Sequence, residues 1–254
     1  MNKFMRKIKR ALFCLLLFGQ QVQAETIYLA SLSWPPYAGE QLAQQGASVA
    51  VARAAFKAMG HELVVDFYPW SRAVKLAADP NSKYAGYFPE YLYETGQFEF
   101  SDAMGEGPLG LVEKNRFPLN WSKIEDLQKY QLGVVQDYVN TTEIDLLIAK
   151  KVLKVQEAIS DELNIKKVSA GRIDGAIMDV NVFRYLLRQQ AQHKTLKEPL
   201  QINDKLLAMK RLYVAFNKHD DSSQWLTIYN QGLAKIDAQK IMASYFLSIE
   251  NMNH

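Results

Sequence analysis

The sequence predicts an α/β protein with two lobes, each a mostly parallel sheet flanked by helices. Strand-like and helix-like segments alternate in two successive sets along the chain. The chain has 254 residues, enough for one large domain or two small ones. Its hydrophobic fraction of 48% is ordinary for a globular protein, and it contains no repeat of fixed period. Together these observations favour two packed α/β units.

The first set begins with a strand at residues 27–32, which ends at Trp34-Pro35-Pro36-Tyr37 because two prolines prevent further pairing. A helix is expected over 48–59, since apolar residues recur at spacings of three and four and Gly60 follows. Further predicted elements are a strand at 63–67, a short helix over 71–78 with Ser71 as its N-cap, a strand at 84–88 and an alternating segment at 98–100. This order is typical of a parallel sheet covered by helices.

The second set repeats the alternation with new segments. Strands are predicted at 131–135, 152–155, 173–178, 200–202 and 212–216, and helices at 141–150, 161–170, 180–190, 222–236 and 238–249. In open sheets of this kind, ligands bind at the carboxyl ends of the strands. Two lobes that face each other therefore place those ends around one cleft.

The N-terminus has the features of a secretory signal peptide. Five bases and no acid occur in residues 1–10, an apolar run covers 11–18, and small residues precede a cleavage site after Ala24. The apolar run is about half the length of a membrane-spanning helix. An uncleaved membrane anchor is the alternative, and a lipid on Cys14 is disfavoured because Cys14 lies inside the apolar run. We therefore predict a periplasmic protein that begins at Glu25.

Removal of residues 1–24 changes the charge of the chain. It leaves 25 Lys and Arg against 27 Asp and Glu, a net charge of −2, so nucleic acid is not an expected partner. The single cysteine leaves with the signal peptide. The exported chain then has no disulfide framework and depends on its hydrophobic core.

Five short motifs in a fixed order carry a resemblance to a known family. They are Ser33-Trp34-Pro35-Pro36-Tyr37, Pro69-Trp70-Ser71-Arg72-Ala73, Phe98-Glu99-Phe100-Ser101-Asp102, residues 127–135 with Gly133, and residues 171–179. The chain resembles the family-3 extracellular solute-binding proteins, the receptors of polar amino-acid ABC transporters, and above all their stand-alone relatives. The match covers nearly all of residues 25–250, and the order of the motifs is more specific than any one of them.

The resemblance implies a two-lobed, type II periplasmic-binding-protein-like fold. Lobe 1 would comprise residues 25–112 and 206–254, lobe 2 residues 113–205, and two crossing strands would form the hinge. Such proteins close like a jaw on a small molecule. The resemblance further implies a monomer without cofactor or metal that serves an ABC permease or a membrane sensor.

Candidate ligand-binding residues of lobe 1 follow its first two strands. In the family an aromatic side chain at Tyr37 often lines the cleft, and one at or near Trp70 often lies against the ligand. Trp34 is a further candidate, and each of these rings has the alternative of packing within its own lobe. Arg72 lies in the first helical turn, which is unfavourable for a cation, so we consider a role in holding an anionic group. Its alternative is a surface ion pair.

Glu94 marks a departure from the family pattern. Amino-acid receptors of the family carry an arginine there, whose planar fork binds the ligand α-carboxylate. A carboxylate reverses both the charge and the hydrogen-bond donors, so the sequence disfavours an α-amino acid held in the usual way. Either Arg72 takes the carboxylate, or the ligand is neutral or cationic, or the pocket has drifted. Among the many aromatic residues of this segment, Tyr87 and Tyr91 are the cleft candidates, with core packing as the alternative.

Lobe 2 contributes candidates where its strands meet helices. Tyr138 and Asn140 follow a predicted strand and open a helix, where backbone N–H groups suit a polar group. Asp137 would weaken an anion site at this position. In the family an Asp at the position of Asp179 pairs with the ligand amine; its alternative is a helix N-cap, and the two roles are compatible.

Two other functional classes compete with transport. A few proteins on this fold are enzymes, including dehydratases of cyclohexadienyl acids. The exported chain lacks a cysteine, and its histidines 61, 193, 219 and 254 are scattered and form no metal or catalytic motif. A cleft carboxylate remains the one candidate acid or base, and we expect no enzyme. A ligand sensor that hands its closed form to a membrane partner has the same composition as a transport receptor.

Overall fold

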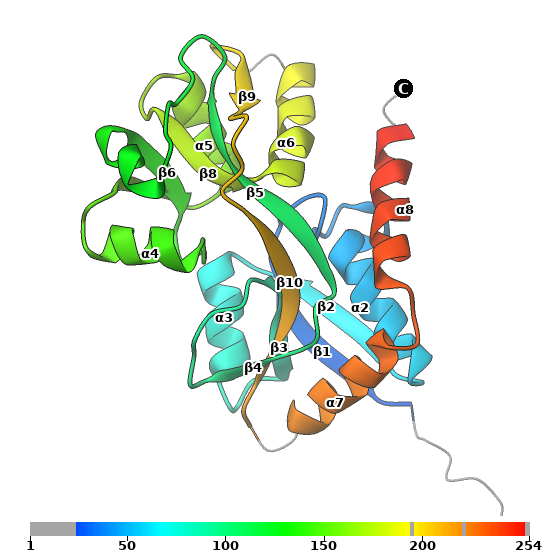
Figure 1. Cartoon of the computed structure of the whole chain (residues 1–254). Helices are drawn as coiled ribbons and strands as arrows, with labels where there is room; N and C mark the ends of the chain where they lie inside the picture. The colour runs from blue at the N-terminus through cyan, green and yellow to red at the C-terminus, as the bar shows by residue number, and fades with distance from the viewer. Residues whose placement is uncertain (1–23, 194–195, 220–221, 252–254) are drawn as a thin grey trace, which may run out of the picture.

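The computed structural model describes residues 24–193, 196–219 and 222–251. Except for Ala24, the predicted signal peptide lies outside the described residues. Ten strands form one continuous, curled sheet in the order β2-β1-β3-β10-β5-β8-β6-β7, with β4 paired to β10 and β9 to β5. Helices cover this sheet in two groups, which gives the two-lobed α/β fold that the sequence predicts (Figure 1).

Lobe 1 is built on β1 (Thr26–Ser31), β2 (Glu62–Phe67), β3 (Tyr84–Glu90) and β4 (Phe98–Phe100). Strands β2 and β3 flank β1, and both pair with it in parallel. The lobe also contains the 3-10 helix η1 (Ala43–Gln45), α2 (Ala47–Ala58), α3 (Trp70–Ala78), α7 (Ser222–Leu233) and α8 (Ala238–Asn251). Helix α2 packs against both α7 and α8, so the end of the chain closes the first lobe.

Lobe 2 is built on β6 (Gln131–Val135), β7 (Lys154–Ala158), β8 (Gly175–Asp179) and β9 (Leu200–Ile202). Strands β7 and β8 flank β6, and both pair with it in parallel. Its helices are the 3-10 helix η2 (Ile124–Lys129), α4 (Thr142–Ala149), α5 (Asp161–Ser169) and α6 (Val180–His193). The second lobe thus repeats the parallel arrangement of the first.

Two long strands run between the lobes and pair with each other in antiparallel fashion: β5 (Gly105–Lys114) and β10 (Ala208–Asn217). The first half of β10 pairs with β5, and its second half pairs with β3 and β4. A register shift between Tyr213 and Ala215 marks where β10 enters the sheet of lobe 1. These strands are the two-strand hinge of the fold (Figure 1).

Most predicted elements are confirmed to within a few residues, and three differences have physical reasons. Strand β5 was not predicted, because Gly105, Gly107, Pro108 and Gly110 interrupt its pattern. The strand predicted at 152–155 lies at 154–158, after a turn at Lys151 with φ +59°. The N-cap prediction for Ser71 was wrong: α3 begins one residue earlier and is preceded by Pro69. The residue limits predicted for the two lobes stay a prediction.

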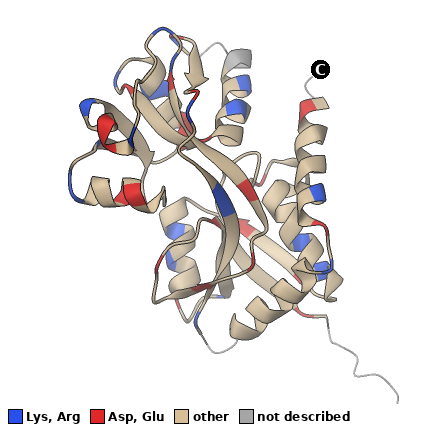
Figure 2. Cartoon of the chain, viewed as in Figure 1, with Lys and Arg blue, Asp and Glu red and all other residues tan. Residues whose placement is uncertain are grey.

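Basic and acidic residues are interspersed over both lobes, as Figure 2 shows. This is the distribution expected from a charge near neutrality. Within the described part of the chain, the helices are too short or too polar for any of them to cross a membrane.

Candidate ligand-binding cleft

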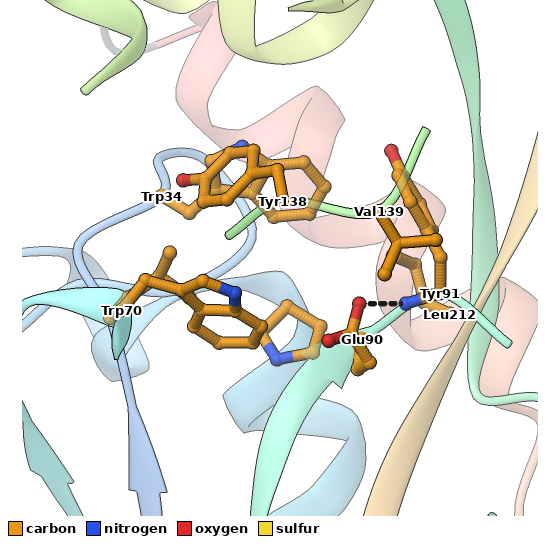
Figure 3. A pocket seen from close by; sticks show the side chains of 9 residues that line it. Trp34, Trp70, Glu90, Tyr91, Tyr138, Val139 and Leu212 are labelled. Carbon is orange, nitrogen blue, oxygen red and sulfur yellow. Dashed lines mark hydrogen bonds between the residues drawn. The ribbon is translucent and has the colours of Figure 1, made fainter. Parts of the chain in front are cut away.

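A pocket lies where side chains from both lobes meet beside the hinge (Figure 3). Its lining is mostly aromatic and aliphatic, with one carboxyl group: Leu32, Trp34, Trp70, Pro89, Glu90, Tyr91, Tyr138, Val139 and Leu212. Little space remains in this pocket: the centre of a water molecule can occupy a volume of about 20 Å³, which is room for one or two water molecules. The two walls of the cleft are therefore nearly in contact.

Local backbone structure explains how these side chains reach one place. Strand β1 ends before Trp34, β3 ends at Glu90, and β6 is followed by the turn that holds Tyr138. All three strands point their carboxyl ends at the cleft, as expected for ligand sites of open α/β sheets. The turn after β6 contains Asp137 at φ +62°, a left-handed conformation that Asp tolerates better than most residues.

Trp70 connects the walls through the turn after β6. Its indole N–H donates to the Asp137 carbonyl at 3.1 Å, and the Ser71 hydroxyl donates to the Asp137 carboxylate. The Trp70 ring also meets Tyr87 of its own lobe edge-on at 5.2 Å and Tyr138 of lobe 2 at 6.0 Å. Trp70 is thus a wall of the pocket and a contact between the lobes at once.

Tyr37 makes the second connection and is fully buried. Its hydroxyl lies 3.2 Å from Asp179 Oδ2 and accepts a hydrogen bond from Asn181 Nδ2 at 2.8 Å. Its ring stacks on Trp34 at 4.6 Å. Gly107 of β5 permits this approach, because a Cβ there would lie 2.3 Å from the Tyr37 hydroxyl and 2.2 Å from Asp179 Oδ2.

Glu90 is the carboxyl group of the pocket lining and is 5% exposed. Its Oε1 accepts the Tyr91 N–H at 2.6 Å, and its Oε2 accepts the Tyr87 hydroxyl at 3.3 Å. Burial raises the pKa of Glu90 to about 8, although these hydrogen bonds and the charge of Lys210 act in the opposite direction. Burial thus favours the protonated form of Glu90.

Two further buried carboxyl groups come from lobe 2. Asp179 ends β8, and its Oδ1 accepts the N–H groups of Asn181 and Val182 at 2.8 and 3.1 Å, which confirms a capping role at the start of α6. Asp161 is the first residue of α5. Burial raises the pKa of Asp179 and of Asp161 to about 7. For Asp161, the charge of Asp179 raises the pKa further, and a hydrogen bond from Trp34 lowers it.

Lys210 of β10 is the basic group nearest to these acids. Its ammonium donates to the Asn140 carbonyl of lobe 2 and lies 4.7 Å from the centre of the Tyr91 ring. Burial lowers the pKa of Lys210, against the attraction of Asp145 and Glu90. A cation–π contact and a cross-lobe hydrogen bond therefore already occupy this amine.

The structure brings eight of the nine predicted site residues to the cleft or directly behind it. Trp34, Trp70, Tyr91 and Tyr138 line the pocket, Tyr37 and Tyr87 contact that lining from behind, and Asp179 bonds Tyr37. Asn140 is buried, its side chain donates to Asp145, and its carbonyl accepts Lys210. Arg72 lies apart from them: it is exposed and stacks on Tyr68 at 5.1 Å.

Sequence reasoning missed Glu90, Asp161 and Lys210. Glu90 follows a proline at which the predicted strand was ended, and Lys210 precedes the predicted part of β10. Asp161 was predicted only as a helix start. Glu94, the position of the missing arginine, is exposed and outside the pocket lining. A signal existed only in the strand-end position of Glu90, which the parallel sheet directs to the cleft.

The described residues contain no group of three His, Cys, Asp or Glu side chains placed to hold a metal ion.

Tyr91 is buried and its hydroxyl has no hydrogen-bond partner. Burial raises the pKa of Tyr91, and the nearby charges of Asp179, Tyr37 and Asp161 add to that rise. The pocket thus offers an unused donor beside a group of acids.

Comparison with known proteins supports the fold. No protein-family model and no curated protein sequence matches the chain. Among solved structures, the chain is similar to a histidine kinase sensor domain with similarity to periplasmic binding proteins, with a TM-score of 0.72, 17% identity, and coverage of 87% of this chain and 95% of that one.

Two binding proteins are similar to the same extent. An ancestral arginine-binding protein bound to arginine matches with a TM-score of 0.71 and 16% identity, over 88% of this chain and 97% of that chain. A periplasmic binding protein of Salmonella typhimurium with high arginine specificity matches with a TM-score of 0.67 and 19% identity, over 87% and 97%. The chain therefore has the periplasmic-binding-protein-like fold expected from its sequence.

Proposed function

We propose that this chain is a periplasmic solute-binding protein, related to the family-3 receptors, that closes its lobes around a small polar or amphipathic molecule for ABC-type uptake. The molecule is amino-acid-like in size and is cationic or neutral. The observation that carries the proposal is the pocket itself, in which residues of both lobes meet around one carboxyl group and several rings. Such convergence of a few polar groups in an apolar pocket is typical of small-molecule sites.

The cross-lobe contacts support closure as the working motion. Trp70 and Ser71 contact Asp137, Tyr37 contacts Asp179, and Lys210 contacts Asn140. All of these join lobe 1 or the hinge to lobe 2. Because the pocket leaves room for little more than water while these contacts are in place, they must separate to admit a ligand.

A ligand sensor is the second candidate. The structural likeness to a kinase sensor domain supports it. In both roles the closed form is the signal that a membrane partner reads. We propose a binding role rather than catalysis, because the pocket lining holds one carboxyl group among aromatic and aliphatic side chains.

A thermal-shift screen on residues 25–254 tests binding. The panel holds amino acids, polyamines, dipeptides, aromatic acids and sugars, offered to protein stripped of bound ligand. A ligand at 100 times its Kd adds about 2.7 kcal/mol, a rise in Tm of roughly 5–10 °C for a chain of this size. Trp70→Ala should abolish the rise, since it removes one wall of the pocket.

Trp121→Ala is the matched control. Trp121 is a half-buried lobe 2 residue outside the pocket, whose indole donates to Asn203. This variant should melt earlier and yet keep the full rise with ligand. A screen in which no compound raises the Tm of the unmodified protein, or in which Trp70→Ala keeps the rise, would contradict the proposal.

A further inference from the structure

We infer that the ligand of this cleft is an organic cation, whose charged group lies against the Glu90 carboxyl between the rings of the pocket. This inference rests on the proposed binding function and adds the chemical class of the ligand. It further assigns to Glu90 the exchange of a proton for the ligand cation, so that binding releases a proton to solvent.

The charges around the pocket favour a cation. Glu90 lines the pocket, and two further buried carboxyl groups, those of Asp161 and Asp179, lie close enough to Tyr91 of the lining for their charges to add to the rise in its pKa that burial causes. Two basic groups act on them: Lys210 on Glu90, and the exposed Arg184 on Asp179. The pocket lining contains one carboxyl group and no basic side chain, and Lys210 already donates to the Asn140 carbonyl, so the lining favours a cation over an anion.

The rings add a second, independent preference. Figure 3 shows Trp34 and Tyr138 on one side of the pocket and Trp70 on the other, with the Glu90 carboxyl beside the Trp70 ring. Indole and phenol faces attract an ammonium or guanidinium group, and the attraction grows in a desolvated site. The placement of Lys210 over the Tyr91 ring at 4.7 Å shows this contact already in use beside the pocket.

The hydrogen-bond inventory agrees with this ligand class. The carboxyl of Glu90 is the acceptor that an amine or guanidinium N–H needs, and it has one protein partner on each oxygen, which leaves a lone pair free on each. The buried Tyr91 hydroxyl is free to bond a second, polar end of the molecule. A ligand with a cationic head and a small polar tail satisfies both groups.

Proton exchange follows from the surroundings of Glu90. The ionisable groups that face it are Tyr87, Tyr91 and Tyr93 from β3 and the following loop, Tyr138 from the turn after β6, and Lys210 from β10. The tyrosines stay neutral near pH 7, and burial raises the pKa of Glu90 to about 8 although the hydrogen bonds from Tyr91 and Tyr87 and the charge of Lys210 act in the opposite direction. A ligand cation stabilises the ionised carboxylate and lowers that pKa, which expels the proton.

The test uses residues 25–254 and pairs of probes that differ in charge. Choline is compared with 3,3-dimethylbutan-1-ol, its neutral isostere, and putrescine with butane-1,4-diol; agmatine, arginine and glutamate complete the set. Titration calorimetry at pH 6, 7 and 8, in two buffers of different ionisation enthalpy, gives affinity and proton release. We expect at least one cation to bind tenfold or more tightly than its neutral isostere, with release of close to one proton at pH 7 and tighter binding at pH 8 than at pH 6.

Glu90→Gln and Glu94→Gln form the matched pair of variants. Glu90→Gln should lose at least tenfold in affinity for the cation and most of the proton release, whereas the exposed Glu94→Gln should behave like the unmodified protein. If Glu90→Gln does not fold, the proton release and the isostere comparison in the unmodified protein still decide the question.

The outcomes separate the two proposals. Tighter binding of glutamate or of a neutral isostere, or cation binding that releases no proton, overturns this inference and leaves the binding function standing. No binding by any member of this panel or of the thermal-shift panel overturns both.

Discussion

The two walls of the cleft use acidic residues in different ways. In lobe 2, Asp179 ends a strand and bonds the first N–H groups of α6, and Asp161 opens α5. Both acids also reach lobe 1, Asp179 through the Tyr37 hydroxyl and Asp161 through Trp34. In lobe 1, Glu90 ends β3, precedes no helix, and bonds only its neighbours Tyr87 and Tyr91.

This difference separates structural acids from an acid available for a ligand. A carboxylate at a helix start is stabilised by the helix whether or not a ligand is present. Glu90 has no such compensation, and it is the acid that lines the pocket. We therefore expect changes in lobe 2 acids to alter stability first, and changes in Glu90 to alter ligand binding first.

The dependence of folding stability on pH is the largest effect that can test this comparison between the acids of lobe 2 and Glu90. The folded pKa is about 8 for Glu90 and about 7 for Asp161 and Asp179, above the ordinary values of 4.5 and 3.8. Between these limits the folded state binds more protons than the unfolded state, so the stabilisation is complete below about pH 4 and is lost as pH rises through 7 to 8. Urea denaturation of ligand-free protein should show the free energy of unfolding falling by on the order of a few kcal/mol from pH 5 to pH 8.

Single variants divide this pH dependence between the walls. Glu90→Gln should remove the part of the fall that extends to pH 8, and Asp161→Asn a part that ends near pH 7. A profile that is flat or rises over this range would show that the three groups are not protonated in the folded state.

Trp70→Ala gives the next largest effect, because this residue of lobe 1 contacts the turn of lobe 2. Loss of a buried indole costs about 3 kcal/mol of unfolding free energy. Trp70→Phe keeps a ring against Tyr87 and loses the bond to the Asp137 carbonyl, at a cost of about 1 kcal/mol. Chemical denaturation of both variants measures the difference; equal stabilities would mean that the ring packing contributes nothing across the cleft.

Gly107→Ala probes the point at which the walls touch. The new methyl group would overlap the Tyr37 hydroxyl and Asp179 Oδ2, so the closed form should lose about 2 kcal/mol and ligand affinity more than tenfold. Small-angle scattering should report a larger radius of gyration. Gly96→Ala, with no atom within 4 Å of the new methyl group, is the control. A closed, fully stable Gly107→Ala protein would contradict the contact.

Arg72→Ala has the smallest expected effect. Arg72 is exposed and its one charge contact is the Tyr68 ring, worth about 0.5 kcal/mol. Ligand affinity should change less than about twofold, since one exposed cation–π contact is a small part of the binding energy. A loss of tenfold or more would instead support the sequence-based prediction that Arg72 holds an anionic group of the ligand.

The fold could be predicted from the sequence wherever periodicity was strong. Strands β1, β6 and β9 and the helices after β6 and β8 are placed nearly to the residue, because apolar spacing and turn residues agree there. Strand β5 was invisible, since its three glycines and Pro108 remove the pattern of side chains. The pairing of β5 with both β10 and β8 is a long-range property that local sequence does not encode.

The residues of the candidate site likewise fall into those that the sequence could predict and those that it could not. Aromatic residues at strand ends, such as Trp34 and Tyr138, could be predicted because both their type and their position point to a cleft. Glu90 and Lys210 could not, because a lone charged residue in a strand has no spacing to mark it. Only the burial that the assembled lobes impose distinguishes Glu90 from the exposed Glu94 four residues later.

Strand β10 has a consequence for the kinetics of binding. Leu212 lines the pocket and Lys210 bonds lobe 2, and both lie on a strand that the two lobes share. If the lobes turn about this strand, as we propose, the pivot and the ligand contact are one piece of backbone. Substitutions at such positions alter two properties together. Residence time and selectivity would then change together. A substitution in β10 that alters which ligand is preferred would also alter the rate at which the cleft binds and releases it.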